Sequence, residues 1–131
     1  TLATVTGGAC LSSLAARADE TAAAKPKLIG LLFYADWCGS CKVLDPRLTA
    51  VKQQFRGKPI LFTRVDETDD FTKHQSRLHM ALLGLDKVYA AEGGKTGFLL
   101  LIDAASGRVL ERLTRGHEEA QISAAIQKAL G

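Results

Sequence analysis

The chain has 131 residues, 47% of them hydrophobic, which is enough apolar material for one globular core and too little length for two domains. Its formal net charge of +3 comes from basic residues that are scattered, not gathered into a stripe with aromatic residues between them, so we expect no nucleic acid partner. The three cysteines are too few for a disulfide scaffold, and none has zinc-finger spacing.

The first 18 residues are typical of the end of an export signal. A run of small, weakly apolar residues leads to Ala16-Arg17-Ala18, which has the A-x-A form of a signal-peptidase site. We therefore expect residues 1–18 to be a signal-peptide remnant, residues 19–27 to be a linker, and the protein to be exported, to a bacterial periplasm. Two alternatives remain for this stretch: an alanine-rich helix of the mature domain, and lipidation at Cys10. The stretch is too short and too polar to span a bilayer, so we expect no stable membrane insertion.

The remaining residues, 28–131, predict one α/β domain. A continuous apolar run at 28–34 has the length of a central strand that is buried on both faces. Apolar residues at helical spacing then predict a helix that ends near Gly57, and residues 60–65 predict a second strand. The order strand, helix, strand is typical of a parallel pair with a right-handed crossover.

The second half of the chain predicts two further helices and a hairpin. Thr68-Asp69-Asp70 offers side-chain oxygens for a helix N-cap, and Gly84 is a natural helix end. Ser106-Gly107 is typical of a tight turn between antiparallel strands. The expected elements are a helix at 70–83, an irregular stretch at 85–96, strands at 98–102 and 108–114, and a terminal helix at 118–130.

The chemistry-bearing motif is Cys38-Gly39-Ser40-Cys41, where the first strand gives way to the first helix. A cysteine at a helix N-terminus faces unpaired backbone N–H groups and the positive end of the helix dipole, and both favour the thiolate. We therefore expect Cys38 to be the nucleophile and Cys41, on the same helix face, to be the resolving cysteine. Gly39 leaves room for another polypeptide, and Trp37 supplies a flat apolar wall. The alternatives are a structural disulfide and half of a zinc site.

From Leu28 to Leu130 the sequence resembles the thioredoxin family, through Ala35-x-Trp37-Cys38-Gly39-x-Cys41-Lys42 and through Pro46 beyond the second cysteine. The motif is most similar to that of the periplasmic thioredoxin-like domains of membrane-bound disulfide interchange reductases. The resemblance implies a thioredoxin fold, in which a central mixed β-sheet is flanked by helices. It also implies dithiol–disulfide exchange, with protein thiols and disulfides and an upstream redox partner as its partners. We expect a monomer without cofactor or bound metal.

The sequence departs from the family pattern at three places around the motif. Ser40 stands where thioredoxins usually carry proline, and Leu32 stands where family reductases carry a buried carboxylate. Asp36 is then the nearest candidate proton acceptor for the resolving thiol. No proline occupies the position of the family's cis-proline, where Thr96 or Gly97 falls instead; we favour Thr96 as a substrate contact. A trans bond there changes both the grip on substrate and the exclusion of metal from the thiolates.

The favoured function is thus that of an exported thiol:disulfide oxidoreductase. Two other functions remain open. One is a copper-handling module in which both motif cysteines are soft metal ligands. The other is a redox-inert domain that kept the fold and binds a partner.

Overall fold

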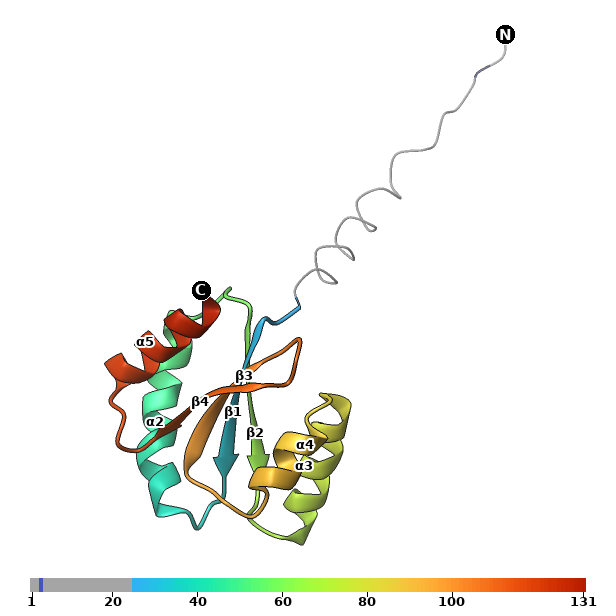
Figure 1. Ribbon diagram of the computed structural model, residues 1–131, viewed down its shortest axis with the longest axis vertical. Coiled ribbons are helices and arrows are strands. Elements are labelled where there is room, and N and C mark those ends of the chain that lie inside the picture. Colours follow the sequence, from blue (N-terminus) through green and yellow to red (C-terminus); the bar gives the residue numbers. More distant parts are fainter. Residues whose placement is uncertain (1–2, 4–24) are drawn as a thin grey trace.

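The computed structural model describes residue 3 and residues 25–131 (Figure 1). The predicted export signal, apart from residue 3, and most of the predicted linker lie outside the described residues, so the domain boundaries stay predictions. Within the described residues the elements are, in chain order, β1 (Leu28–Tyr34), α2 (Gly39–Gln54), β2 (Ile60–Asp66), α3 (Asp70–Leu82), α4 (Asp86–Glu92), β3 (Phe98–Asp103), β4 (Val109–Thr114) and α5 (Glu119–Leu130).

The strands form one mixed sheet in the order β2-β1-β3-β4. β1 pairs parallel with β2 across the α2 crossover and antiparallel with β3, and β4 completes a hairpin with β3. This arrangement confirms the predicted thioredoxin fold, with its central mixed sheet and flanking helices, and confirms that the first strand lies inside the sheet.

Helices cover both faces of the sheet, which explains why β1 is apolar throughout. α2 and α5 lie on one face and α3 and α4 on the other (Figure 1). Alternate residues of a strand point to opposite faces, so each face of β1 needs apolar side chains. Leu28 and Leu32 pack into the core beneath α2 and α5, whereas Leu31 and Phe33 pack into the core beneath α3 and α4.

The stretch at 85–96 differs from the prediction, because Asp86–Glu92 forms the short helix α4. Its N-cap residue, Leu85, makes no side-chain capping bond, so the usual sequence signal for a helix start is missing. Leu85 and Val88 are buried in the core on the α3 side of the sheet. Burial of these apolar side chains therefore stabilises a helix that local sequence signals do not mark.

Three chain segments meet at one edge of the sheet, where the motif lies. In the parallel pair, Tyr34 at the end of β1 is opposite Asp66 at the end of β2. In the antiparallel pair, Phe33 is opposite Phe98 at the start of β3. The segments that follow Tyr34, follow Asp66 and precede Phe98 are therefore neighbours, although they are far apart in the sequence.

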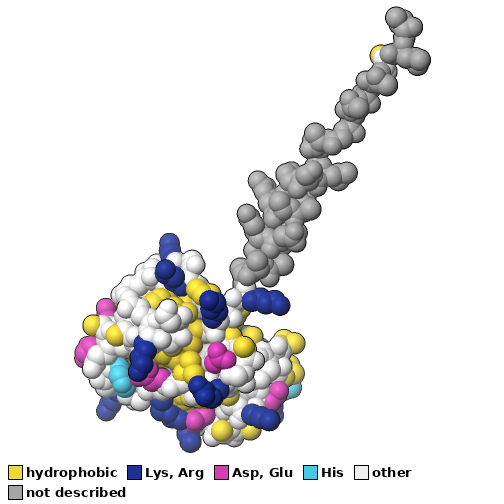
Figure 2. All heavy atoms as spheres, turned by 45° about the horizontal axis from the view of Figure 1, so that its top comes forward, with side chains coloured by type: hydrophobic (Ala, Val, Ile, Leu, Met, Phe, Trp, Pro, Cys, Tyr) yellow, Lys and Arg dark blue, Asp and Glu magenta, His cyan; other side chains and the backbone are white. Residues whose placement is uncertain are grey.

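Basic side chains are spread over the face of the molecule that Figure 2 shows. On the face shown in Figure 2, Lys and Arg side chains stand apart from one another, with Asp and Glu side chains among them. This face carries no continuous basic stripe of the kind that tracks a nucleic acid backbone.

Candidate active site

Cys38 lies at the junction between β1 and α2, in the N-cap position of the helix. Its backbone is extended, with φ −83° and ψ 113°, and its Sγ accepts a hydrogen bond from the backbone N–H of Cys41 at 3.3 Å. The first turn of a helix has backbone N–H groups without partners and carries the positive end of the dipole. The Cys38 sulfur therefore takes the role that a Ser, Thr or Asp oxygen usually has at a helix start.

The surroundings of Cys38 favour its thiolate. Burial by itself would raise the pKa of the Cys38 thiol, but hydrogen bonds from the side chains of Cys41 and Thr96 and from the backbone at Cys41 and Ser40 outweigh burial, and the pKa falls below its ordinary value. The thiolate is the nucleophilic form of cysteine. Cys38 is therefore the more reactive sulfur of the pair.

The surroundings of Cys41 favour its protonated thiol. Its thiol is fully buried, and its Sγ donates to the backbone carbonyl of Phe33 at 3.5 Å. Burial, followed by the hydrogen bond with Cys38, raises the pKa of Cys41 to about 11. Both thiols are free in this structure. One sulfur thus tends toward the thiolate while its neighbour keeps its proton.

Gly97, just before β3, approaches the motif more closely than any other residue type could. Its backbone N–H donates to the carbonyl of Phe33 at 2.8 Å, and its φ is +91°. A Cβ at this position would lie 2.7 Å from the Cβ of Ser40 and 3.3 Å from the Sγ of Cys38. The described residues contain no cis peptide bond. The chain therefore has glycine backbone against the nucleophile, and the Thr96 side chain also reaches its sulfur.

The turn after β2 holds the loop that precedes the motif. Trp37 donates from Nε1 to the carbonyl of Thr68 at 3.1 Å, and the backbone N–H of Asp36 donates to the Thr68 Oγ1 at 3.0 Å. Trp37 is 60% exposed, so this bond orients an indole that is largely open to solvent. Sequence reasoning missed this role of Thr68. The parallel pairing of the first two strands was the available signal, since it brings the two following loops together.

No carboxylate of the described residues hydrogen-bonds to the Cys41 thiol. Leu32 packs into the apolar core beneath α2 and α5, as its side chain requires. Asp36 is exposed, and the contact that ties it to the site is made by its backbone. The role of Asp36 as proton acceptor stays a prediction.

Residue 3 and residues 25–131 contain no group of three or more His, Cys, Asp or Glu residues arranged to hold a metal ion. No helix among them is both long enough and apolar enough to cross a bilayer.

Comparisons with known proteins identify the family. The thioredoxin family model matches residues 13–80. Thioredoxin-T of Drosophila melanogaster is 38% identical over 50 residues, which are 37% of this chain and 32% of that protein. Protein disulfide-isomerase A4 of Mus musculus is 34% identical over 64 residues, which are 47% of this chain and 9% of that protein. The matched region is thus a minor part of the length of both relatives.

Solved structures agree with the family match at the level of the fold. The structure of a thiol:disulfide interchange protein from Chlorobium tepidum TLS has a TM-score of 0.57 and 22% identity, and covers 85% of each chain. Because the family model spans more than half of the sequence and the fold agrees with it, this chain belongs to the thioredoxin family.

Proposed function

We propose that the protein is a thiol:disulfide oxidoreductase that exchanges disulfides with protein substrates through Cys38 and Cys41. The observation that carries this proposal is the placement of the two cysteines: the Cys38 sulfur caps the N-terminus of α2, and the Cys41 thiol is fully buried beside it. The pKa of Cys38 is lowered, while that of Cys41 is raised to about 11. An attacking thiol has to be available as thiolate, whereas a resolving thiol has to wait until the mixed disulfide has formed.

In the reducing direction, the Cys38 thiolate attacks one sulfur of a substrate disulfide. A bond forms between Cys38 and that sulfur, the substrate S–S bond breaks, and the other substrate sulfur leaves as a thiolate. Cys41 then gives up its proton and attacks the Cys38 Sγ, which releases the second substrate sulfur. Two electrons and the Cys41 proton have passed to the substrate, and the protein holds a Cys38–Cys41 disulfide. The same steps in reverse oxidise a substrate dithiol.

The surface beside Cys38 suits a polypeptide substrate. The exposed indole of Trp37 offers an apolar wall on one side of the sulfur. Thr96 and Gly97 also lie beside the sulfur, where the backbone of Gly97 is close to both Cys38 and Ser40. We propose that a monomer binds its substrate at this surface and that an upstream redox partner resets the cysteine pair.

Export to a bacterial periplasm is the second part of the proposal, and it is supported by Ala16-Arg17-Ala18 and the small-residue run before it. Expression of the protein from its own gene in a bacterium tests this part. A product in the periplasmic fraction that begins at Asp19 supports export, whereas an uncleaved cytoplasmic product contradicts it.

Insulin reduction, with a chemical reductant as electron source, tests the redox chemistry. We expect Cys38→Ser to abolish activity, because the attacking sulfur is lost. We expect Cys41→Ser to stop after the first step and to accumulate a mixed disulfide with insulin, visible on a non-reducing gel. In the uncleaved 131-residue chain, Cys10→Ser is the matched control, because it removes the third cysteine and leaves the motif unchanged.

The redox-inert alternative makes a different prediction. If Cys38→Ser retained wild-type insulin reduction, or if the wild-type pair failed to cycle in a glutathione titration, the proposal would be wrong. The midpoint of that titration also gives the reduction potential, which decides the direction in which electrons flow.

A further inference from the structure

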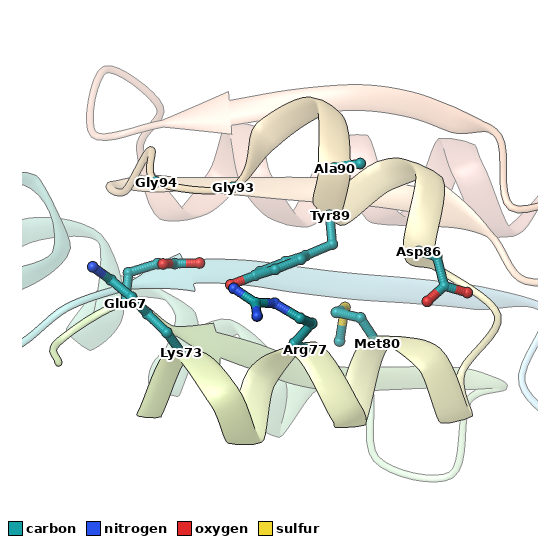
Figure 3. A pocket seen from close by; sticks show the side chains of 9 residues that line it. All are labelled: Glu67, Lys73, Arg77, Met80, Asp86, Tyr89, Ala90, Gly93 and Gly94. Atoms are coloured by element: carbon teal, nitrogen blue, oxygen red, sulfur yellow. The ribbon is translucent and has the colours of Figure 1, made fainter. Parts of the chain in front are cut away.

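The chain reaches Cys38 from α4 through residues 93–97, the α4–β3 loop, which has little packing of its own. Its first two residues are Gly93 and Gly94, which have no side chains and line a pocket of about 530 Å³ between α3 and α4 (Figure 3). Lys95, the next residue, is exposed. With so few buried contacts, the conformation of this loop depends on what holds its two ends.

The last residue of the α4–β3 loop is held at the end of β1. The backbone N–H of Gly97 donates to the carbonyl of Phe33 at 2.8 Å, and the same carbonyl accepts a hydrogen bond from the Cys41 thiol. The Phe33 ring stacks on the ring of Phe98, with 4.6 Å between the two centroids. This end of the loop is thus attached to the strand that leads into the cysteine pair.

The start of the α4–β3 loop is held by an ion pair with β4. Glu92 is the last residue of α4, and its carboxylate pairs with Arg112 of β4 through Oε1 and with Lys95 through Oε2, at 3.5 Å. The Arg112 guanidinium also lies over the Phe98 ring, 4.2 Å from its centroid. Arg112 therefore connects the residue that begins the loop to the aromatic pair at its end.

The ion pair between Glu92 and Arg112 has features that an ordinary surface pair lacks. Exposed pairs contribute little, because water competes for both charges and two long side chains lose freedom. Here the Glu92 side chain is only 17% exposed, and the Arg112 guanidinium lies on an aromatic face as well as against the carboxylate. The hydrogen bond from Arg112 is the largest cause that lowers the pKa of Glu92, so the pair stays ionised at neutral pH.

We propose that Arg112 and Glu92 are positioning residues for disulfide exchange: their ion pair fixes the α4–β3 loop and so holds Thr96 and Gly97 beside the Cys38 sulfur. This inference rests on the proposed function, since it gives the pair a part in keeping the nucleophile reactive. Both residues act through the loop and not by contact with the sulfurs.

The pH profile of Cys38 alkylation by iodoacetamide, in the reduced full chain, tests the proposal. The thiolate is the reacting form, so the rate at about pH 6 reports how strongly the surroundings favour it, and the plateau at high pH reports access to the sulfur. Tandem mass spectrometry locates the label on Cys38 and separates it from Cys10 and Cys41. We expect Arg112→Met to slow alkylation at the lower pH by about three- to tenfold, as for one weakened hydrogen bond to a thiolate, with a plateau at least as high as in the wild type.

Glu92→Gln distinguishes positioning from a direct effect of charge. If Arg112 favoured the thiolate by its charge alone, the loss of the negative charge at Glu92 would speed alkylation, because a repulsive charge is removed. Positioning predicts the opposite: Glu92→Gln slows alkylation about as much as Arg112→Met does. The double variant Glu92→Gln/Arg112→Met should be no slower than either single variant, since both substitutions break the same interaction.

Matched variants show whether the effect belongs to this pair. Arg108 precedes β4 at the other end of the hairpin, and Glu111 lies on the α5 side of the sheet. We expect Arg108→Met and Glu111→Gln, which remove the same charges, to react as the wild type does. Arg112→Lys keeps the cation and should recover most of the wild-type rate, and circular dichroism checks that each variant is folded.

Three results would overturn the proposal: wild-type alkylation at the lower pH in Arg112→Met, faster alkylation in Glu92→Gln, or a lowered plateau in both variants. The last result would mean that the pair affects access to the sulfur and not its thiolate. Failure of the proposed function is distinguishable, because it is shown by Cys38→Ser that still reduces insulin, whereas alkylation measures the Cys38 thiol without a disulfide substrate.

Discussion

Thr96 and Gly97 lie beside the Cys38 sulfur and affect its surroundings, although neither side chain carries a charge. Burial raises the pKa of Cys38, but the hydrogen bonds with the Cys41 side chain and then with the Thr96 side chain help to lower it below its ordinary value. Gly97, the next residue, brings backbone against the motif at a distance that leaves no space for a Cβ. The chain achieves this close approach because Gly97 has no side chain, at a φ that L-residues rarely adopt.

Gly97→Ala tests the importance of this close approach. The added Cβ meets Ser40 at 2.7 Å and is strained by a φ of +91°. We expect the free energy of unfolding in urea to fall by about 2–4 kcal/mol, from steric overlap and backbone strain together. We also expect slower alkylation of Cys38 by iodoacetamide, since the clash displaces groups beside its sulfur.

Gly57→Ala is the control for the strain contribution. Gly57 has a φ of +75°, but a Cβ there meets nothing within 4 Å. We expect it to lose about 1–2 kcal/mol and to leave alkylation unchanged. Equal losses of stability in the two variants would show that the contact with Ser40 and Cys38 contributes nothing.

At the scale of elements, the site depends on how the turn between β2 and α3 contacts the loop between β1 and α2. The parallel register sets Tyr34 opposite Asp66, so the two chain segments leave the sheet side by side. Thr68 then accepts one hydrogen bond from Asp36 through its hydroxyl and another from Trp37 through its carbonyl. Its backbone N–H donates to Asp66 Oδ1 at 2.9 Å, which holds the turn itself in place.

Thr68→Val removes the hydroxyl and keeps the shape of the side chain. We expect a loss of about 0.5–1.5 kcal/mol in the free energy of unfolding, because the Asp36 N–H loses its acceptor. The emission of Trp37 should shift as the loop becomes less constrained. Thr68→Ser keeps the hydroxyl and should restore both properties; if Thr68→Val matched the wild type in both, the turn would not hold the loop.

At the scale of the whole molecule, the two thiols make stability depend on pH in opposite directions. The lowered pKa of Cys38 adds stability as pH rises toward the ordinary thiol value, since the folded form gives up its proton first. The raised pKa of Cys41 affects stability at higher pH, between 9.0 and about 11. The folded protein keeps this proton while the unfolded chain loses it, so the Cys41 contribution is complete below pH 9.0 and is lost as pH rises toward about 11.

We therefore expect the free energy of unfolding of the reduced protein to fall more steeply between pH 9 and 11 in the wild type than in Cys41→Ser. The difference in slope should be at most about 1.4 kcal/mol per pH unit, the limit for one proton. Urea unfolding across this pH range measures it. Tyr89, whose pKa is raised to about 12, contributes to both proteins alike. Parallel pH profiles would contradict the assignment of the raised pKa to Cys41.

Local sequence patterns predicted the elements that carry their own signals. The apolar run at 28–34, the cap oxygens before Asp70 and the Ser106-Gly107 turn each correspond to an observed element boundary. α4 was not predicted, because it begins at an uncapped Leu85 and is stabilised by burial of Val88. Its stability comes from contacts with residues distant in the chain, which no local pattern records.

By itself, the sequence determined the position of the cysteine pair at a strand–helix junction and the absence of proline near Gly97. Spacing along the chain sets both. Only the tertiary structure decided which groups surround the pair: the Phe33 carbonyl at Cys41, Thr96 and Gly97 at Cys38, and Thr68 under Trp37. The same holds for the ion pair between Glu92 and Arg112. These contacts depend on strand register and helix packing, and a hydrogen bond or a pKa depends on separations of a few ångströms that spacing along the chain does not specify.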